Sequence, residues 1–198
     1  RPAVKTFNGA MEKISFDADF TAQIRKAAAK QGSTFYVFMM AAYKAYLSRI
    51  TGQEDIVFGV AAAGHNLPGN ANLVAHAISL LPVRSKVNPQ GEFKDFLKQV
   101  RKQVLDAFDH QQYTFGALVK KLKIGRNASR NTLVSVAFNL DSPLDDLKFG
   151  SLTATTRAIP RHYETFDTFI NLKPLGSTID FEWNFNTDLF RRESIRLR

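Results

Sequence analysis

The sequence has no cysteine and is poor in the other residues that most often carry chemistry. Its 198 residues include one tryptophan and four histidines, which are His65, His76, His110 and His162. Without cysteine, disulfides and thiolate chemistry are excluded, which favours a reducing compartment such as the cytoplasm. The histidines form no i, i+4 pair and no HExxH pattern, so we expect no metal site.

Long hydrophobic runs are also missing. Crossing a bilayer takes ~20 apolar residues, and the longest candidate, residues 34–47, is interrupted by Lys44. This run predicts a buried helix, and we expect no association with a membrane. The first residues, RPAVKTFNG, contain neither an initiating methionine nor the hydrophobic stretch of a signal peptide. We therefore expect the chain to be a piece of a longer protein.

What the sequence does contain predicts a folded, basic domain. Hydrophobic residues make up 44%, and the 17 phenylalanines fall in periodic segments, which predicts a packed core rather than disorder. The formal net charge is +9. This charge favours an acidic partner such as nucleic acid, a membrane surface or an acidic protein, or it belongs to a solvated basic surface. Both interpretations remain open.

Hydrophobic periodicity predicts one α/β unit, a mixed β-sheet flanked by helices. Apolar spacing and capping residues predict helices from Asp17 or Asp19 to Gly32, from Ser33 or Thr34 to Arg49, and at 93–108 and 115–122. Alternating or β-branched runs predict strands at 11–16, 56–64, 75–87, 133–141, 149–159, 166–173 and 177–186. Pro82 indicates an edge or a bulge, and PLGS at 174–177 predicts a hairpin turn.

Motifs of nucleophilic, phosphate and dinucleotide sites do not occur. The patterns GxSxG, GxxxxGK[ST] and GxGxxG are all absent, so those chemistries have no basis in the sequence. His162 is followed by Asp167, which is the nearest approach to the HHxxxDG motif of one class of acyltransferases. The second histidine and the glycine are missing and the spacing differs. We interpret His162 as a loop residue rather than a general base.

Two charged clusters have simple structural interpretations. The acidic run at Asp141, Asp145 and Asp146 lacks the spacing of a calcium loop and predicts a solvated turn. A nucleic-acid surface would interleave basic residues with exposed aromatic ones. The basic stretch lacks that interleaving, which leaves nucleic-acid binding a less favoured alternative: Lys120, Lys121, Lys123, Arg126 and Arg130.

Five stretches carry motif-like patterns in a fixed order. Residues 47–64, LSRITGQEDIVFGVAAAG, are similar to LxRxTGQxDIVxGxPxAGR, and residues 73–84, LVAHAISLLPVR, to VGxxVNxLPLR. Residues 110–122, HQQYTFGALVKKL, are similar to HQDxPFExLV. Residues 126–141, RNASRNTLVSVAFNLD, follow RDxSRxPLFxVxFNL, and residues 181–190, FEWNFNTDLF, follow LEYNTDLF. Together these stretches resemble the later motifs of condensation domains of nonribosomal peptide synthetases.

The resemblance implies that residues 1–198 form the C-terminal subdomain of a chloramphenicol acetyltransferase-like (CoA-dependent acyltransferase) fold. Two similar halves of that fold enclose a tunnel, which receives phosphopantetheine arms from acidic peptidyl or acyl carrier proteins. An acceptor amine attacks a donor thioester there and forms an amide. The HHxxxDG motif lies in the other half, so the resemblance implies no catalytic residue and no directly bound cofactor in this chain. We expect the chain alone to be inactive.

The chain departs from the family pattern at several positions, including Ser79-Leu80, Gly116 and Asn127. By the resemblance, Arg126 and Arg130 are structural anchors. The candidates for lining the tunnel are Asn139, Ser79, His76 and Asn186. Structural alternatives remain open: a strand-end amide for Asn139, a buried hydrogen-bonded ring for His76 and a turn-holding role for Asn186.

Other functions also remain open. An epimerization, cyclization or ester-forming relative would differ mainly in the other half. A binding-only platform for carrier proteins would keep the fold without catalysis. The surface that meets the other half would expose apolar groups, through which the chain could associate with itself.

Overall fold

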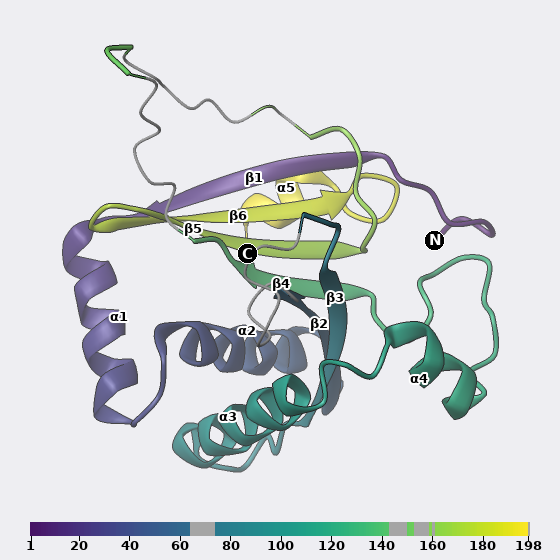
Figure 1. Cartoon of the computed structure of the whole chain (residues 1–198), viewed down its shortest axis with the longest axis horizontal. Coiled ribbons are helices and arrows are strands. Elements are labelled where there is room, and N and C mark those ends of the chain that lie inside the picture. Colours follow the sequence, from purple (N-terminus) through teal and green to yellow (C-terminus); the bar gives the residue numbers. More distant parts are fainter. Residues whose placement is uncertain (64–73, 143–149, 153–158, 160, 198) are drawn as a thin grey trace.

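A six-stranded mixed β-sheet forms the centre of the protein in a computed structural model (Figure 1). The structure describes residues 1–63, 74–142, 150–152, 159 and 161–197. The elements in chain order are β1 (Gly9–Phe16), α1 (Ala18–Lys30), α2 (Phe35–Thr51), β2 (Asp55–Ala63), β3 (Ile78–Lys86), α3 (Phe93–Asp109), α4 (Phe115–Leu122), β4 (Val136–Leu140), β5 (Thr168–Leu175), β6 (Thr178–Asn186) and α5 (Arg192–Arg196).

The strands lie in the order β1-β6-β5-β4-β2-β3. The inner strands β2, β4 and β5 run parallel, whereas β1, β3 and β6 run antiparallel to their neighbours. The sheet is therefore mixed, which confirms the predicted fold class. Pro82 lies on the edge strand β3, opposite Gly59 of β2, where its missing N–H removes no bond from an inner strand. The edge placement of Pro82 is also confirmed.

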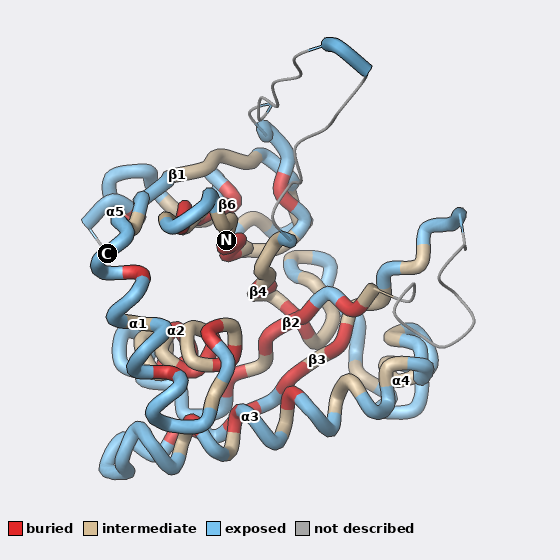
Figure 2. The backbone as a smooth tube through the Cα atoms, turned by 60° about the vertical axis from the view of Figure 1, so that its left-hand side comes forward, coloured by how far each residue is buried: buried red, intermediate tan, exposed pale blue. Residues whose placement is uncertain are grey.

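One face of the sheet, which we call the helical face, carries Phe58, Phe138 and Trp183. Helices α1, α2, α3 and α5 pack against this side and bury it. Figure 2 shows the buried residues concentrated along β2, β3 and the adjoining helices. The ring of Tyr43 on α2 lies 5.5 Å from that of Phe58 and 5.6 Å from that of Trp183. Aromatic contacts of this kind hold the central helix to the sheet.

Local signals explain where the first helices begin. The side chain of Asp17 accepts a hydrogen bond from the N–H of Phe20, and that of Thr34 accepts one from the N–H of Val37. Each supplies a partner to an N–H group that the helix itself leaves unsatisfied. These caps confirm the predicted starts of α1 and α2. Within the described residues, no helix combines the length and the apolar character needed to cross a membrane.

Lys44 interrupts the apolar run of α2, yet its side chain is fully buried. Its Nζ donates to the carbonyl oxygen of Val83 at 2.7 Å and to the hydroxyl of Ser85 at 2.8 Å. The same Nζ atom lies 5.0 Å from the ring centroid of Phe58. The hydroxyl of Ser85 donates in turn to the side chain of Gln103 on α3. The lysine therefore joins α2, β3 and α3 through polar contacts in the core.

Several predicted boundaries differ from the structure. The run predicted as a strand from 133 forms one only from Val136, because Leu133 has a φ of 66°, which reverses the extended backbone. The strand predicted from 75 begins at Ile78. Strands β5 and β6 extend to Leu175 and Thr178, so the turn is shorter than predicted and uses Gly176 at a φ of 60°. Most of the strand predicted at 149–159 lies outside the described residues.

Gly9 marks a close approach between β1 and the segment before β5. A Cβ atom at Gly9 would lie 2.7 Å from the carbonyl carbon of Tyr163 and 2.8 Å from the N atom of Glu164. Because both are backbone atoms, neither can rotate away. We expect Gly9→Ala to lower the free energy of unfolding by about 1–3 kcal/mol, measured by urea denaturation. Gly125→Ala is the matched control, since no atom of the described residues lies within 4 Å of its added Cβ; equal losses in both variants would contradict the prediction.

Candidate functional site

The parallel strands β2, β4 and β5 end at the same edge of the sheet, where β3 begins; we call this the carboxyl edge. Ligands of open α/β sheets bind outside the carboxyl ends of the strands. Asn139 is the penultimate residue of β4, and Ser79 pairs with Ala62 near the end of β2. The structure thus brings two of the predicted tunnel residues to this edge.

Asn139 belongs to a hydrogen-bonded array on the face opposite the helices, which we call the amide–carboxylate network: Asn139, Asp141, Asn171 and Glu182. The Nδ2 of Asn139 donates to Asp141 Oδ1 at 2.8 Å and to Asn171 Oδ1 at 2.9 Å. The Nδ2 of Asn171 donates to Asp141 Oδ2 at 2.9 Å and to Glu182 Oε2 at 3.0 Å. The network spans β4, β5 and β6, because Asn139 pairs with Asn171 and Asn171 with Glu182 in the sheet register.

A second group of polar residues lies beside the network on the same face. Lys13 of β1 pairs with Asp180 of β6 at 3.0 Å, and the Ser15 hydroxyl donates to the other carboxylate oxygen at 2.6 Å. Burial acts to raise the pKa of Asp180, but the hydrogen bonds from Ser15 and Lys13 outweigh it and lower the pKa. This part of the face therefore carries fixed charges and amides.

The other predicted residues at the carboxyl edge do not join the network. Ser79 faces the helical side of the sheet, because its register places it on the same face as Leu81 and Val83. His76 precedes β3 and is exposed, so the alternative of a buried, hydrogen-bonded ring does not hold here. Neither residue contacts Asn139 through a hydrogen bond within the described chain.

Asn186 lies at the opposite edge, where β6 ends and β5 begins. Its buried side chain donates to the carbonyl oxygen of Thr6 at 2.7 Å and accepts from the N–H of Asp188 at 2.9 Å. These bonds tie the strand end to the N-terminal segment and to the turn that follows. The geometry supports the alternative that Asn186 holds the turn, and it separates this residue from Asn139.

Of the predicted anchors, Arg130 lies near this opposite edge, as do His162 and Asp167. In the described residues, no hydrogen bond or ion pair involves the guanidinium group of Arg126 or Arg130. Asp167 pairs with Arg1 rather than with His162, whose ring is exposed. Among the described residues, no group of His, Asp or Glu could hold a metal ion. Of the acidic run, residues 145 and 146 lie outside that part of the chain.

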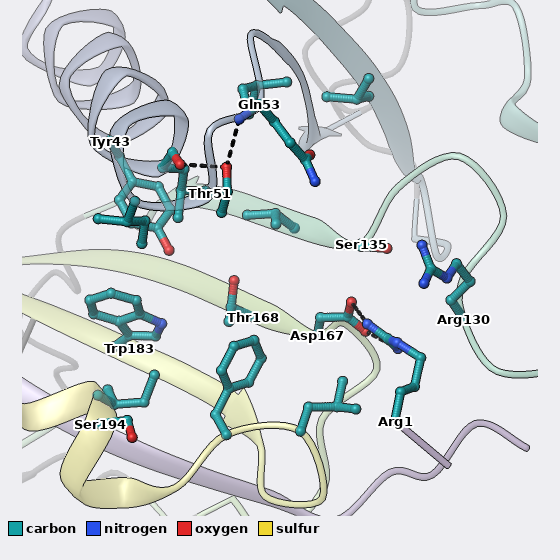
Figure 3. A pocket seen from close by; sticks show the side chains of 18 of the residues that line it. Arg1, Tyr43, Thr51, Gln53, Arg130, Ser135, Asp167, Thr168, Trp183 and Ser194 are labelled. Carbon is teal, nitrogen blue, oxygen red and sulfur yellow. Dashed lines mark hydrogen bonds and ion pairs between the residues drawn. The ribbon is translucent and has the colours of Figure 1, made fainter. Parts of the chain in front are cut away.

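A cavity of about 830 Å³ opens on the helical face between α2 and α5, above the amino ends of β4 and β5 (Figure 3). Arg130 lines it, and the Arg1–Asp167 ion pair lies at its side. Tyr43, Thr168 and Trp183 point their polar atoms toward this space (Figure 3). Their polar atoms are buried and have no hydrogen-bond partner among the described residues. Burial also raises the pKa of Tyr43 above its ordinary value.

The two polar regions differ in what they can do. The cavity lies at the opposite edge, above the amino ends of β4 and β5, and the polar atoms of Tyr43, Thr168 and Trp183 have no hydrogen-bond partner among the described residues. The amide–carboxylate network lies at the carboxyl edge, where the amide of Asn139 is held by two partners and that of Asn171 by three. Fixed polar groups at this edge suit the orientation of a reactant better than unpartnered ones. We therefore take Asn139 and its network as the candidate functional site.

Sequence reasoning missed Asn171 and Glu182. Both lie in strands that were predicted from their apolar and aromatic content, and no role was predicted for their polar side chains. A signal was present: Asn171 alternates with Ile170 and Leu172, and Glu182 alternates with Phe181 and Trp183. Residues of alternate parity point to opposite faces of a strand. The pairing of the two residues, however, depends on a register that alternation does not supply.

Comparison with known proteins places this geometry in a family. The Condensation domain family matches residues 1–197. Tyrocidine synthase 3 of Brevibacillus parabrevis is 32% identical over 98% of this chain, and surfactin synthase subunit 1 of Bacillus subtilis (strain 168) is 31% identical over 98%. The chain belongs to the condensation-domain family. It spans 3% and 5% of the length of these two relatives.

Solved structures share the fold. A four-domain nonribosomal peptide synthetase, holo-AB3403, superposes with a TM-score of 0.88 at 16% identity, covering 99% of this chain and 16% of that one. The first condensation domain of the calcium-dependent antibiotic synthetase gives 0.81 at 19% identity, covering 100% of this chain and 44% of that one. The X-domain from teicoplanin biosynthesis gives 0.86 at 18% identity, with 98% and 45% covered.

Proposed function

We propose that this chain is the C-terminal subdomain of a condensation domain that forms amide bonds in a nonribosomal peptide synthetase. The family match over residues 1–197 carries the proposal. In the reaction, the nitrogen of an acceptor amine attacks the carbonyl carbon of a donor thioester. The C–N bond forms and the C–S bond breaks. The sulfur leaves as a thiol that takes up the proton lost by the amine.

The contribution of this chain is positional rather than catalytic. It supplies one wall of the tunnel, with the amide–carboxylate network at the carboxyl edge. The other half of the domain supplies the HHxxxDG motif, which is not present in residues 1–198. Effective concentration and orientation supply a large share of the rate in such a reaction, so a wall that fixes the reactants matters even without a base.

The proposed partners are carrier proteins and the other half of the domain. Carrier proteins deliver donor and acceptor on phosphopantetheine arms, and this chain binds no cofactor of its own. Its net charge of +9 would speed encounter with an acidic carrier protein. Large apolar side chains are exposed before β3, at its first residue and after β4: Val74, Ile78, Leu152 and Ile159. They suit a contact with the other half in the cytoplasm, or self-association when that half is absent.

Activity of the chain alone and of the longer synthetase that contains it tests the proposal. Donor and acceptor thioesters are loaded on carrier proteins, and the product is measured by mass spectrometry of the acceptor carrier. We expect amide on the acceptor with the longer protein and none with residues 1–198 alone. Turnover by the isolated chain, or no amide from the longer protein with any loaded pair, contradicts the proposal.

A binding-only platform is the second candidate. The X-domain of teicoplanin biosynthesis has also been solved in a complex with OxyB, and that structure superposes on this chain with a TM-score of 0.85. A binding-only platform would bind a protein partner and form no amide. The same assay separates the two candidates, because with a binding-only platform the longer protein gives no amide from any loaded pair.

A further inference from the structure

The amide–carboxylate network has a fixed polarity. A carboxylate oxygen accepts hydrogen bonds and donates none, whereas an amide has one donating and one accepting end. Asn171 faces carboxylate oxygens of Asp141 and Glu182, at 2.9 and 3.0 Å, so its Nδ2 must lie on that side. Its Oδ1 is then directed at Asn139. The orientation of Asn171 follows from its two acidic neighbours.

The orientation of Asn139 follows in the same way. Asp141 Oδ1 and Asn171 Oδ1 are both acceptors, at 2.8 and 2.9 Å, and both contact the Nδ2 of Asn139. Both hydrogens of this amide are therefore used within the network. Turning the amide over would set its oxygen against two other oxygens, at the loss of two hydrogen bonds. The side chain is held with its Oδ1 directed away from the network.

This Oδ1 has no donor among the described residues. The side chain is half-buried, so this oxygen is not enclosed in the core and a ligand in the tunnel could reach it. The position offers an acceptor only, because no N–H of Asn139 is left over. A ligand that meets it must therefore bring an N–H or O–H group, and a thioester carbonyl, which can only accept, does not qualify.

We propose that Asn139 Oδ1 accepts a hydrogen bond from the amine that attacks the thioester, with Asp141 and Asn171 as positioning residues. The proposal rests on the amide-forming function proposed above. As the amine attacks, its nitrogen becomes positively charged and its N–H groups become stronger donors. A fixed carbonyl oxygen then stabilises the transition state more than the free amine. Asp141 and Asn171 act by keeping that oxygen, rather than the NH2 group, toward the amine.

The orientation is tested first, in the 198-residue chain, by NMR of side-chain amides. We expect the Asn139 NH2 signal, identified by its loss in Asn139→Ala, to exchange slowly with water because both hydrogens are bonded. Asp141→Asn replaces an acceptor by a group that can also donate, so Asn139 can turn over. We expect faster exchange of the Asn139 signal in that variant. Fast exchange already in the unsubstituted chain overturns the orientation.

The contact with the amine is tested in the longer synthetase, with the donor on its carrier protein. The acceptor probe is a free amino acid methyl ester, which has no phosphopantetheine arm. We expect Asn139→Ala to lower kcat/KM for the ester roughly 10- to 100-fold and Asp141→Asn to lower it by a smaller factor. The KM for the donor carrier should not change in either. Asn127→Ala is the matched control, since among the described residues its side-chain amide forms hydrogen bonds only with the nearby Ser129.

The outcomes separate this proposal from the proposed function. If the unsubstituted protein forms no amide from loaded carriers, the function itself fails. If it forms amide and Asn139→Ala uses the ester as well as the unsubstituted protein does, the contact with the amine is wrong. Equal losses of kcat/KM for the donor carrier and for the ester in Asn139→Ala, at unchanged thermal stability, would also overturn the contact with the amine. Such losses would indicate a general effect on the tunnel wall. If Asp141→Asn leaves kcat/KM for the ester unchanged, Asp141 is not a positioning residue.

Discussion

Replacing Lys44 with methionine is expected to remove a large pH dependence of stability. Burial lowers the pKa of Lys44 from 10.5 to about 7 in the folded chain. The groups around it are Phe58 from β2, Val83 and Ser85 from β3, and, through Ser85, Gln103 from α3. None is acidic, so no opposite charge offsets the burial. In Lys44→Met the titrating group is absent while much of the buried volume is kept.

The direction follows from proton binding. Between pH 7 and pH 10.5 the unfolded chain holds the proton of Lys44 and the folded chain does not, so folding releases a proton and stability rises with pH. Below pH 7 Lys44 is protonated in both states, and the free-energy cost of burying its charge is present in full. Above pH 10.5 Lys44 is neutral in both states, and this cost disappears. From pH 7 to pH 10 the free energy of unfolding should rise by about 3–4 kcal/mol more in the unsubstituted chain than in Lys44→Met.

Urea denaturation at pH 7, 8, 9 and 10 measures this difference. Lys26→Met is the matched control, because Lys26 is exposed on α1 and its removal should leave the pH dependence of the unsubstituted chain in place. The same pH dependence in Lys44→Met and in the unsubstituted chain would show that the buried amine keeps its proton, and the prediction would be wrong.

Lys44 also shows where sequence reasoning about the fold stops. Helix α2, the cap of this helix at Thr34 and the burial of the helix were all predictable from apolar periodicity and capping chemistry. A lysine in such a run is expected to interrupt burial, because a charged group is costly in the core. Its acceptors are Val83 and Ser85, 39 and 41 residues further along the chain. Only the packing of α2 on β3 brings them together.

The candidate site also contains features that the sequence predicts and features that it does not. That the side chain of Asn139 has hydrogen-bond partners was predictable, because a polar residue near the end of an apolar strand needs them. Its partners Asn171 and Glu182 were not, since they reach it through the order β4, β5, β6 and a particular register. Asn186 was grouped with Asn139 by motif resemblance, yet the antiparallel course of β6 carries it to the other edge. Composition and motifs thus identified the family and the elements, whereas register decided which side chains meet.

A large loss of stability is also expected from a substitution in β4, the strand that carries Asn139. The ring of Phe138 is fully buried and lies 5.5 Å from the ring of Tyr36 and 6.0 Å from that of Phe58. Removing it leaves a cavity between α2 and the centre of the sheet. We expect Phe138→Ala to lower the free energy of unfolding by about 3–5 kcal/mol. Since domains of this size are stable by about 5–15 kcal/mol, the loss should be visible as a lower midpoint of urea denaturation with an unchanged slope.

Two variants separate the cavity from the loss of an aromatic ring. Phe138→Leu keeps most of the volume and should cost less than about 1.5 kcal/mol. Phe20→Ala removes a ring that is 48% exposed on α1 and should also cost less than about 1.5 kcal/mol. If Phe138→Ala costs no more than these two, β4 is not held by the core. The orientation of Asn139, which depends on the position of that strand, would then need another support.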